Sequence, residues 1–385
     1  MLTWTIHLEG GPKRVNHAAV AIGLRIYSFG GYCTGEDYET TRPMDVHILN
    51  TVTLHWSLLP LPTSKVDLDN TPYQRYGHTA VEYEDCAYIW GGRNDSIGAC
   101  KILYRFCAAT LKWDKPQVSG PVPEARDGHT ACIIQDKMYI FAGYEEFTDR
   151  FSNDMNYLNL KTFEWVAVIF NGNPARWRDF HTATAIGTVM YIYGGRCDHG
   201  GDQFTNNEFY CNRLIAFETV TETWTRLASS TVDAPLGRRS HSAFEYKGSL
   251  YIFGGYNSLL EIHFNDLHRY DFATNQWTRL KVPGIGPSPR RRQCACVIGS
   301  KVYFFGGTSP NVPLDITDES SPSDSDLIDR SDLYVLDFEP SLKTLASLVI
   351  IQHKIECSYL PHDLRWELAI MTTDNNITRL HPTNG

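Results

Sequence analysis

Short apolar segments that each end in a pair of small residues recur along most of the chain. Six of them begin with a tyrosine and reach Gly-Gly or Ala-Gly three residues later, at Tyr27, Tyr88, Tyr139, Tyr191, Tyr251 and Tyr303. The second glycines fall at 31, 92, 143, 195, 255 and 307, so the spacing is 51 to 61 residues. Aromatic and β-branched residues in such runs predict buried strands. The regular spacing predicts an array of similar units.

Each unit contains the same further features in the same order. Five units have an Arg-x-x-His corner upstream, with the histidine 13 residues before the first small residue; these corners are Arg14–His17, Arg75–His78, Arg126–His129, Arg178–His181 and Arg238–His241. A short apolar segment and then a tryptophan follow, at 56, 113, 165, 224 and 277. One unit therefore predicts a four-stranded antiparallel sheet that needs neighbours to cover its faces. Radial stacking of such sheets produces a β-propeller.

The sixth unit lacks a tryptophan after Asp332, and the N-terminus supplies a matching segment around Trp4. We expect this N-terminal strand to complete the last blade, which leaves no open sheet edge between the first and last blades. In the sixth corner Gln293 or Cys294 stands where histidine is expected, and we predict a hairpin one residue shorter there.

These motifs resemble the kelch repeat, and the resemblance covers roughly residues 1–340. We therefore predict an all-β fold, a six-bladed kelch propeller over residues 1–340. From Pro340 the glycines disappear until the last residue, and apolar residues fall at helical spacing. We predict a short helical appendage over residues 341–385.

Composition limits the function classes. The formal net charge is -9 and the calculated pI is about 5.9, so a basic nucleic-acid-binding surface is not expected. Ten cysteines occur without the short spacings of a zinc site, and we expect no cofactor and no metal. No segment resembles a signal peptide or a membrane span. We expect a soluble protein of the cytoplasm, with the nucleus left open.

Insertions differ between units. One follows Gly31, another covers residues 196–210, and a third covers residues 309–329. The third is acidic and rich in serine and proline, which predicts a mobile loop.

Repetition of the Arg-x-x-His corner favours an architectural role, in which both side chains bond to neighbouring carbonyls. The copper enzyme galactose oxidase shares the kelch architecture, but a copper site needs Tyr, His and Cys ligands converging on one face. The repeat already explains the tyrosines and histidines here. We therefore predict a protein that is not an enzyme.

Residues that differ from blade to blade are the better candidates for recognition. One set follows each glycine pair: Tyr32, Arg93, Tyr144, Arg196, Tyr256 and Thr308. The other lies inside the corners: Val15-Asn16, Tyr76-Gly77, Asp127-Gly128, Asp179-Phe180, Arg239-Ser240 and Arg292-Gln293. Arginine and aromatic enrichment indicates a binding rim at one mouth of the channel. The alternative for any single residue is a solvated loop tip.

Two motifs in the tail resemble partner-binding boxes of ubiquitin ligase receptors. Leu342, Ala346 and Ile350 match the spacing of the BC box, which binds elongin C, with alanine in place of the more usual cysteine. Leu360, Pro361, Leu364 and Leu368 are similar to the cullin-2 box. Apolar residues four apart lie along one face of a helix and can enter a partner's groove. The alternative is a helical pair that packs beneath the last blade.

Together these features resemble the kelch-repeat substrate receptors of cullin-2 ubiquitin ligases. The resemblance implies elongin B/C and cullin-2 as partners, and substrate C-terminal peptides that end in glycine as ligands. Arginine and serine donors would hold the terminal carboxylate, and close walls would exclude a side chain. The residues predicted to contact the peptide are Arg93, Asp127, Tyr144, Asp179, Phe180, Arg196, Arg239, Ser240, Tyr256 and Gln293. The resemblance matches the family's first carboxylate-binding arginine to Arg196 and its blade-five corner pair to Arg239-Ser240, with serine where the family has a bulky aromatic residue. The family's second carboxylate-binding arginine has no match, because Gly200 and Gly201 stand in its place.

Two further hypotheses concern the ligand. Asp127, Asp179 and Glu145 are candidates to hold a basic side chain before the terminal glycine; loss of binding to arginine-containing peptides in Asp179→Ala would support this. Because the sequence ends in Gly385, its own C-terminus is a candidate for self-docking. The main alternative function is a kelch scaffold outside any ligase, associated with chromatin like the recombination-activating kelch propeller.

Overall fold

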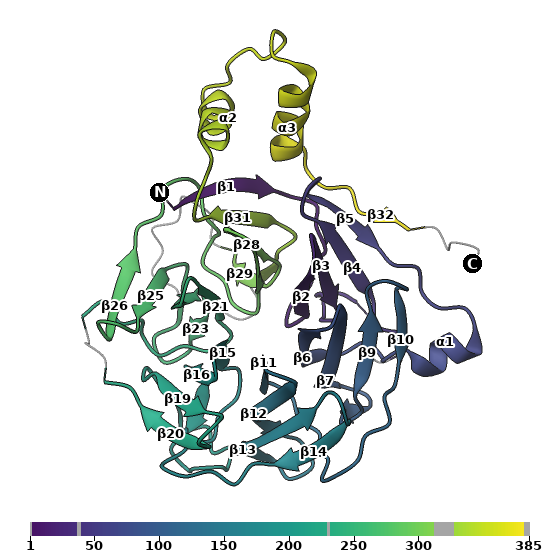
Figure 1. Cartoon of the computed structure of the whole chain (residues 1–385), viewed down its shortest axis with the longest axis vertical. Helices are drawn as coiled ribbons and strands as arrows, with labels where there is room; N and C mark the ends of the chain where they lie inside the picture. Colours follow the sequence, from purple (N-terminus) through teal and green to yellow (C-terminus); the bar gives the residue numbers. More distant parts are fainter. Residues whose placement is uncertain (1, 37–39, 229–231, 312–326, 381–385) are drawn as a thin grey trace.

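The strands form six sheets around a central axis in the computed structural model, which describes residues 2–36, 40–228, 232–311 and 327–380 (Figure 1). Each sheet has four strands in a meander from the axis to the rim, and blades one and two have a fifth strand. The predicted six-bladed propeller is confirmed.

The first three blades consist of consecutive antiparallel strands. Blade one contains β2 (Ala18–Ile22), β3 (Arg25–Phe29), β4 (Val46–Asn50) and β5 (His55–Leu58). Blade two contains β6 (Tyr76–Tyr83), β7 (Cys86–Asn94), β9 (Tyr104–Cys107) and β10 (Lys112–Asp114), with β8 (Gly98–Ala99) beside β7. Blade three contains β11 (Thr130–Ile134), β12 (Lys137–Glu145), β13 (Arg150–Asn159) and β14 (Glu164–Ala167).

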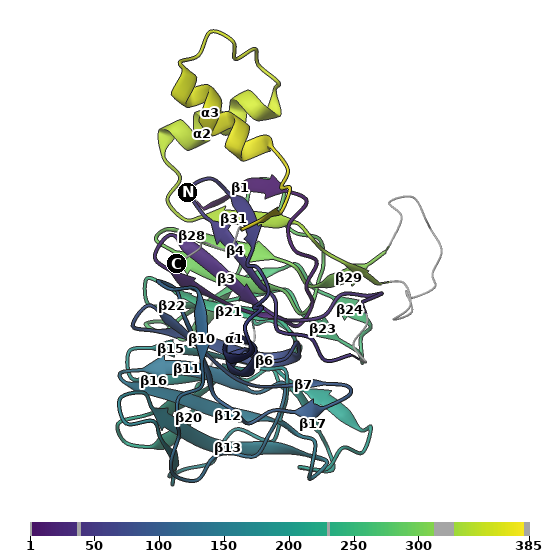
Figure 2. The same ribbon diagram turned by 90° about the vertical axis from the view of Figure 1, so that its right-hand side faces the viewer.

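Blades four to six each add a two-stranded hairpin after the glycine pair. Blade four contains β15 (Thr182–Ile186), β16 (Val189–Tyr193), β19 (Ile215–Glu218) and β20 (Thr223–Arg226), with the hairpin β17 (Arg196–Asp198) and β18 (Glu208–Tyr210). Blade five contains β21 (Ser242–Tyr246), β22 (Ser249–Phe253), β25 (Leu267–Asp271) and β26 (Gln276–Leu280), with β23 (Tyr256–Asn257) and β24 (Ile262–His263). Blade six contains β27 (Cys294–Ile298), β28 (Lys301–Phe305), β31 (Leu333–Asp337) and β1 (Thr3–Leu8), with β29 (Thr308–Pro310) and β30 (Leu327–Asp329). The labelled hairpin strands β17, β24 and β29 project toward the same side of the molecule (Figure 2).

The N-terminal strand closes the ring as predicted. β1 pairs antiparallel with β31, from Thr3 opposite Asp337 to Leu8 opposite Leu333. Trp4 is buried and takes the position of the missing tryptophan of the sixth blade. The first and last blades are thereby joined through backbone hydrogen bonds.

Each blade's tryptophan packs on the preceding blade, against the aromatic residue just before its glycine pair. The ring centroids of these contacts are 5.0 to 6.0 Å apart: Trp56–Phe305, Trp113–Phe29, Trp165–Trp90, Trp224–Phe141, Trp277–Tyr193 and Trp4–Phe253. One cluster of buried apolar residues occupies each interface between neighbouring blades. The core is therefore divided into interfaces rather than gathered at one centre.

Two helices follow the last blade and project away from it (Figures 1 and 2). α2 (Leu342–Gln352) begins at Ser341, whose hydroxyl accepts a hydrogen bond from the Thr344 backbone, and α3 (His362–Thr372) contacts β1. The chain then returns to the propeller as β32 (Thr378–Arg379), which pairs in parallel with β5 of blade one. The sequence did not predict this returning strand.

The connection between blades one and two contains a short helix that the sequence did not predict, α1 (Lys65–Asn70). Ser64 caps it by accepting from the Asp67 backbone N–H. The loop predicted to be mobile falls largely on residues 312–326, which lie outside the described residues. Among the described residues, no helix is long and apolar enough to cross a membrane.

Candidate functional site

The channel is narrowed at the predicted mouth by a closed ring of backbone hydrogen bonds. The ring residues are Asn16, Gly77, Gly128, Phe180, Ser240 and Arg292, one from each corner. Each donates its backbone N–H to the carbonyl of the residue from the preceding blade, at 2.8 to 3.2 Å, and each has a positive φ. A cavity of about 130 Å³ remains along the axis between these residues and the corner histidines. The ring fixes the positions of all six corners.

The corner arginines are architectural, as predicted. In blades two to six the guanidinium donates to the carbonyl of the first residue of the blade's own small pair, for example Arg178 to Gly194 at 2.7 Å. In blade one Arg14 instead pairs with Asp45 and Glu36.

The corner histidines are buried against the preceding blade. His78 contacts the Phe29 carbonyl, whereas His129, His181 and His241 contact threonine hydroxyls rather than the predicted carbonyls. Burial lowers the pKa of His78 and His241 to about 3, so both rings are neutral at physiological pH.

The structure corrects the alignment of the sixth corner. Arg290 donates to the Gly306 carbonyl, and Gln293 occupies the histidine position, with its amide donating to the Phe253 carbonyl of blade five. The spacing from Gln293 to Gly306 is the same 13 residues as elsewhere, so the predicted shortening is wrong. The pair inside this corner is therefore Arg291–Arg292, and Gln293 is buried between blades rather than placed on the rim.

The two predicted rim sets lie side by side. The first inner residue of each corner bridges to the residue after the same blade's glycine pair: Val15–Tyr32, Asp127–Tyr144, Asp179–Arg196, Arg239–Tyr256 and Arg291–Thr308 as isolated bridges, and Tyr76–Arg93 within the blade-two sheet. Side chains from two separate sequence segments thus surround the ring at every blade. Phe180 and Ser240, also predicted to contact a ligand, belong to the ring itself.

Arg196 and Asp179 are bound to each other in blade four. Arg196 Nε donates to Asp179 Oδ1 at 3.1 Å, and its Nη2 donates to Oδ2. The guanidinium also lies over the rings of Phe151 and Phe204, 5.2 and 5.1 Å from their centroids. Burial raises the pKa of Asp179, although the charge of Arg196 opposes that shift. A ligand that binds either side chain must first break this ion pair, which costs free energy.

The other two predicted acids, Glu145 and Asp127, differ in whether they have partners within the chain. Glu145 is buried in ion pairs with Arg126 and Arg150, so it has a structural role. Asp127 has only 5% of its surface exposed, and its Oδ1 has no hydrogen-bond partner among the described residues. Burial, and next the charge of Asp179, raise the pKa of Asp127 to about 7. Asp127 is therefore the predicted acid with a carboxylate oxygen that is buried without a partner.

Arg93 lies near Asp127 and is engaged by other acids. Its Nη2 lies 3.2 Å from Glu146 and 3.6 Å from Asp95. Tyr144 donates its hydroxyl to Asp149 of the same blade. Both predicted residues line the mouth but are held by partners within the chain.

Blade five contains two donors of the mouth that have no hydrogen-bond partner among the described residues. The Arg239 guanidinium makes no hydrogen bond or ion pair with a described residue; it lies 5.7 Å from the centroid of Tyr256. The adjacent Ser240 hydroxyl is buried and has no hydrogen-bond partner in the described chain. These two donors without partners come from adjacent residues, a guanidinium and a hydroxyl, which is the chemistry that suits an anion.

Several mouth residues were missed by sequence reasoning. Arg291 stacks on Tyr256, with its guanidinium 4.4 Å from the ring centroid. Glu208 and Tyr210, in the blade-four insertion, bond to each other and to Ser258 of blade five. The corrected alignment of the sixth corner would have identified Arg291, whereas no sequence spacing places the insertion residues.

The tail motifs fall on the two helices with different exposures. Leu342 is 86% exposed, and Ala346 and Val349 are also exposed on α2, while Ile350 is half-buried. In the second motif Pro361 is exposed, Leu360 and Leu364 are half-buried, and Leu368 is only 8% exposed. Leu368 therefore packs within the chain, in disagreement with its predicted role as a partner contact.

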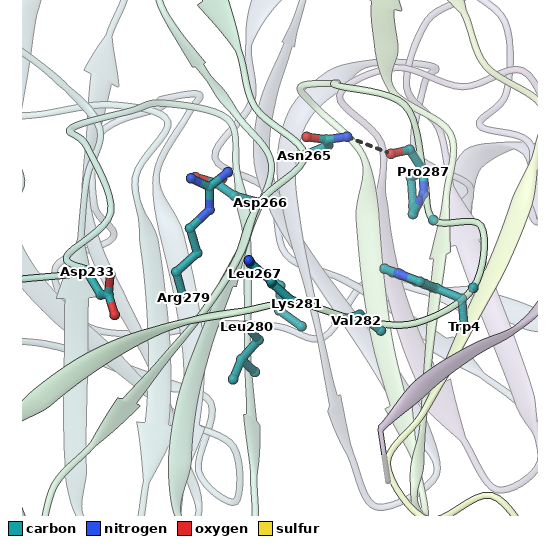
Figure 3. A pocket seen from close by; sticks show the side chains of 12 residues that line it. Trp4, Asp233, Asn265, Asp266, Leu267, Arg279, Leu280, Lys281, Val282 and Pro287 are labelled. Carbon is teal, nitrogen blue, oxygen red and sulfur yellow. Dashed lines mark hydrogen bonds between the residues drawn. The ribbon is translucent and has the colours of Figure 1, made fainter.

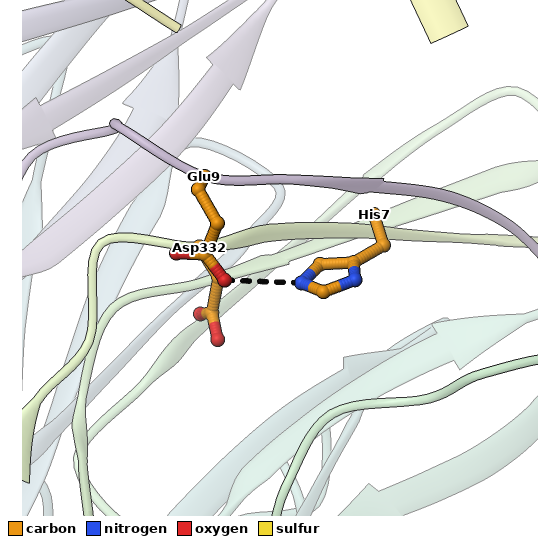
Figure 4. Close-up of side chains that lie close together, drawn as sticks. All are labelled: His7, Glu9 and Asp332. Atoms are coloured by element: carbon orange, nitrogen blue, oxygen red, sulfur yellow. Dashed lines mark hydrogen bonds and ion pairs between the residues drawn. The ribbon is translucent and has the colours of Figure 1, made fainter. Parts of the chain in front are cut away.

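Two other places in the fold bring polar side chains together. A cavity of about 630 Å³ lies beside blade five and Trp4, where the acid Asp266 already pairs with Arg238 and His268 (Figure 3). His7, Glu9 and Asp332 group their ligand atoms within 4.8 Å (Figure 4). Both carboxylate oxygens of Asp332 accept hydrogen bonds from Arg290, so that carboxylate belongs to the corner.

Comparison with known proteins agrees with the repeat pattern. A family model described as the KLHDC2/KLHL20/DRC7 Kelch-repeats domain matches residues 77–307. The chain is similar to Kelch domain-containing protein 3 of Bos taurus and of Homo sapiens, with 55% and 54% identity over 381 residues that cover 98% of each chain. Host cell factor 1 of Homo sapiens is 29% identical over 264 residues, which cover 64% of this chain and 12% of that protein.

Proposed function

Because the chain belongs to the kelch-repeat propeller family that includes Kelch domain-containing protein 3, we propose that it is a substrate-recognition subunit of a cullin-2–elongin B/C ubiquitin ligase. In this role it binds substrate C-termini that end in glycine and brings the substrate to the ligase for proteasomal degradation. It is an adaptor and performs no chemistry of its own. We propose that it acts in the cytoplasm, with the nucleus left open.

The observation that carries the ligase role is the apolar surface of α2. Leu342 is 86% exposed and Val349 is 50% exposed, on a helix that projects from the propeller (Figure 1). Exposed leucine and valine along one helical face suit insertion into a groove on a partner. If the helix served only to pack beneath the last blade, as in a scaffold outside any ligase, this face would be covered.

The mouth supports recognition of a terminal carboxylate. Arg239 and Ser240 supply a charged donor and a buried hydroxyl donor that no described residue occupies. Hydrogen bonds from a guanidinium to a carboxylate are stronger than bonds between neutral groups, and partial burial strengthens them further. Arg196, which the family resemblance matches to a carboxylate-binding arginine, is instead the partner of Asp179.

The environment of the mouth also supports a basic residue before the terminal glycine. Asp127 has an unpartnered, buried oxygen close to the ring. A cationic side chain that reaches it would relieve the cost of burying this charge. We assign this role to Asp127 rather than to Asp179 or Glu145, which are paired within the chain. Gly385, which the self-docking hypothesis invokes, lies outside the described residues.

One reconstitution tests both halves of the proposal. The purified chain is mixed with elongin B/C and cullin-2, and complex formation is followed by size-exclusion chromatography. A fluorescent peptide ending in Arg-Gly is then titrated, with the same peptide carrying a C-terminal amide as the control. We expect a stable complex and loss of peptide binding on amidation. Failure to form the complex would overturn the ligase role, and equal affinity for the amide would overturn carboxylate recognition.

A further inference from the structure

The turn between the third and fourth strands of blade two departs from the other blades. Its first residue in blades one, three, four and five is an acid or an amide: Asn50, Asn159, Glu218 and Asp271. In blade six, whose fourth strand comes from the N-terminus, Asp337 ends the third strand at the same position. A side-chain oxygen of each accepts one or two backbone N–H groups of the residues that follow; Asn159 Oδ1, for example, accepts from Lys161 at 2.9 Å and Thr162 at 3.1 Å. Blade two has Cys107 at this position.

The turn itself has the same geometry in blade two. Leu111 donates its N–H to the Cys107 carbonyl at 2.8 Å, as Phe163 does to Asn159. Leu111 has a φ of 56°, and Phe163 has a φ of 55°. The Cys107 sulfur therefore occupies a position that the repeat uses for a hydrogen-bond acceptor. The Thr110 hydroxyl and the backbone N–H groups of Thr110 and Ala109 lower the pKa of the Cys107 thiol accordingly.

A second cysteine faces this position across the sheet. Cys86 on β7 is directly opposite Cys107 on β9, where other blades place Arg25, Lys137, Val189 or Lys301. Directly opposed residues of an antiparallel pair share one face, with Cα atoms about 4.5–5.5 Å apart, and disulfides span about 4.4–6.8 Å. Both cysteines are half-buried rather than enclosed.

The two thiols have different chemical tendencies. Burial, and next the neighbouring Cys107, raise the pKa of Cys86 to about 11, whereas the pKa of Cys107 is lowered. Cys107 is thus the thiol that ionises first, and Cys86 is the protonated neighbour. This combination of a reactive and a resolving thiol is typical of redox-sensitive pairs.

We propose that Cys86 and Cys107 form a peroxide-sensitive dithiol on blade two. The Cys107 thiolate attacks hydrogen peroxide, so an S–O bond forms, the O–O bond breaks, and hydroxide leaves and takes a proton from solvent. The Cys86 sulfur then attacks the Cys107 sulfur; the S–S bond forms, the S–O bond breaks, and the Cys86 proton leaves with the hydroxyl as water. Two thiols are oxidised to one disulfide, and one peroxide is reduced to two waters.

Cys294 and Cys296 provide an internal control. They lie two residues apart on β27, and burial raises the pKa of both thiols. Residues two apart on one strand are separated by roughly 6.5 Å with parallel side chains, which makes a disulfide between them unfavourable. Both should stay reduced under conditions that oxidise the blade-two pair.

The test uses the full-length, reduced protein. After exposure to hydrogen peroxide, alkylation and trypsin digestion, mass spectrometry should find residues 76–93 linked to residues 106–112, each of which contains one cysteine. Dithiothreitol should release the two peptides. Cys86→Ser should trap a sulfenic acid on Cys107, and Cys107→Asn, which restores the residue of blades one and three, should yield neither product.

Reaction rates provide a second readout at neutral pH. Iodoacetamide should modify Cys107 about tenfold faster than Cys294, because the thiolate is the reacting form. Thermal melting of Cys107→Asn checks that this variant is folded. Absence of the linked peptide, or equal alkylation rates for Cys107 and Cys294 in the folded protein, would overturn the proposal.

Discussion

Arg196 and Asp179 form an ion pair at one corner of blade four, with Asp179 buried, Arg196 half-buried, and Arg196 Nε 3.1 Å from Asp179 Oδ1. The sequence suggested that each would contact a ligand. Since they satisfy each other, the predicted charged contacts that lack a hydrogen-bond partner among the described residues are Arg239 on blade five and Asp127 on blade three. The site keeps the predicted combination of a basic and an acidic side chain, but Arg239 and Asp127 supply them instead of Arg196 and Asp179.

Arg239→Ala should weaken binding of glycine-ending peptides by about 10- to 100-fold, because a charge-assisted hydrogen bond contributes about 1.5–3 kcal/mol. Fluorescence polarisation with a labelled peptide measures this. Arg279→Ala, on the outer strand β26, serves as the matched control and should leave affinity unchanged. An Arg239→Ala protein with wild-type affinity would remove Arg239 from the site.

Asp127→Asn should stabilise the free protein increasingly as pH rises from about 4 to about 7. The pKa of Asp127 is about 7 in the folded chain, against about 3.9 for an ordinary aspartate, so wild-type stability falls as pH rises through this window. The charged groups facing Asp127 are Asp179, Arg93, Arg196 and Glu146. At pH 8 the difference should be about 1–3 kcal/mol, as for a relieved buried charge. Urea unfolding at pH 5 and pH 8 measures it, and an unchanged difference between the two pH values would contradict the prediction.

Asp127→Asn should also reduce the preference of the protein between two peptide ligands. Wild type should bind a peptide ending in Arg-Gly more tightly than one ending in Ala-Gly, and this preference should increase between pH 6 and pH 8 as Asp127 ionises. Asp127→Asn should reduce the preference without weakening the Ala-Gly peptide. If both peptides lose affinity equally, Asp127 stabilises the structure of the mouth and does not contact the arginine side chain of the peptide.

Leu342→Arg and Leu368→Arg should separate partner binding from packing. Leu342 is 86% exposed, so the first variant should keep its melting temperature and lose capture of elongin B/C and cullin-2. Leu368 is 8% exposed, so the second should lower the free energy of unfolding by about 2–5 kcal/mol. Pull-down and thermal melting on both proteins measure this. Capture by a folded Leu342→Arg protein would contradict the proposed role of α2.

Asn375→Ala should loosen the returning strand β32. Asn375 Oδ1 accepts from the Trp56 backbone at 3.0 Å, and the Asn375 N–H donates to the Glu9 carbonyl at 2.7 Å. Gly10 permits this approach: it has a φ of 81°, and a Cβ there would lie 2.0 Å from the Asn375 carbonyl oxygen. Losing the side-chain bond should cost about 1 kcal/mol and increase hydrogen exchange over residues 378–380. Asn376→Ala, at an exposed neighbouring position, should leave exchange unchanged.

Much of the fold is determined by features that repeat along the chain. Six aromatic segments before small pairs, and a tryptophan for each blade, specify the number of blades because each tryptophan must pack on the preceding one. Trp4 indicated closure for the same reason. The same contact recurs between each blade and the preceding one, so a periodic pattern is enough to predict it.

The tertiary structure decided which side chains remain available. The sequence by itself identified Arg196, Asp179, Arg239 and Asp127 as candidates, since they vary where the scaffold is constant. Whether a charge has a partner depends on the side chain beside it: Asp179, 17 residues away, is the backbone bridge partner of Arg196 and accepts its hydrogen bond, whereas the bridge partner of Arg239 is Tyr256. The return of residues 378–379 to blade one likewise depends on an available strand edge. Pairing across distant segments is set by packing in space, which no local spacing encodes.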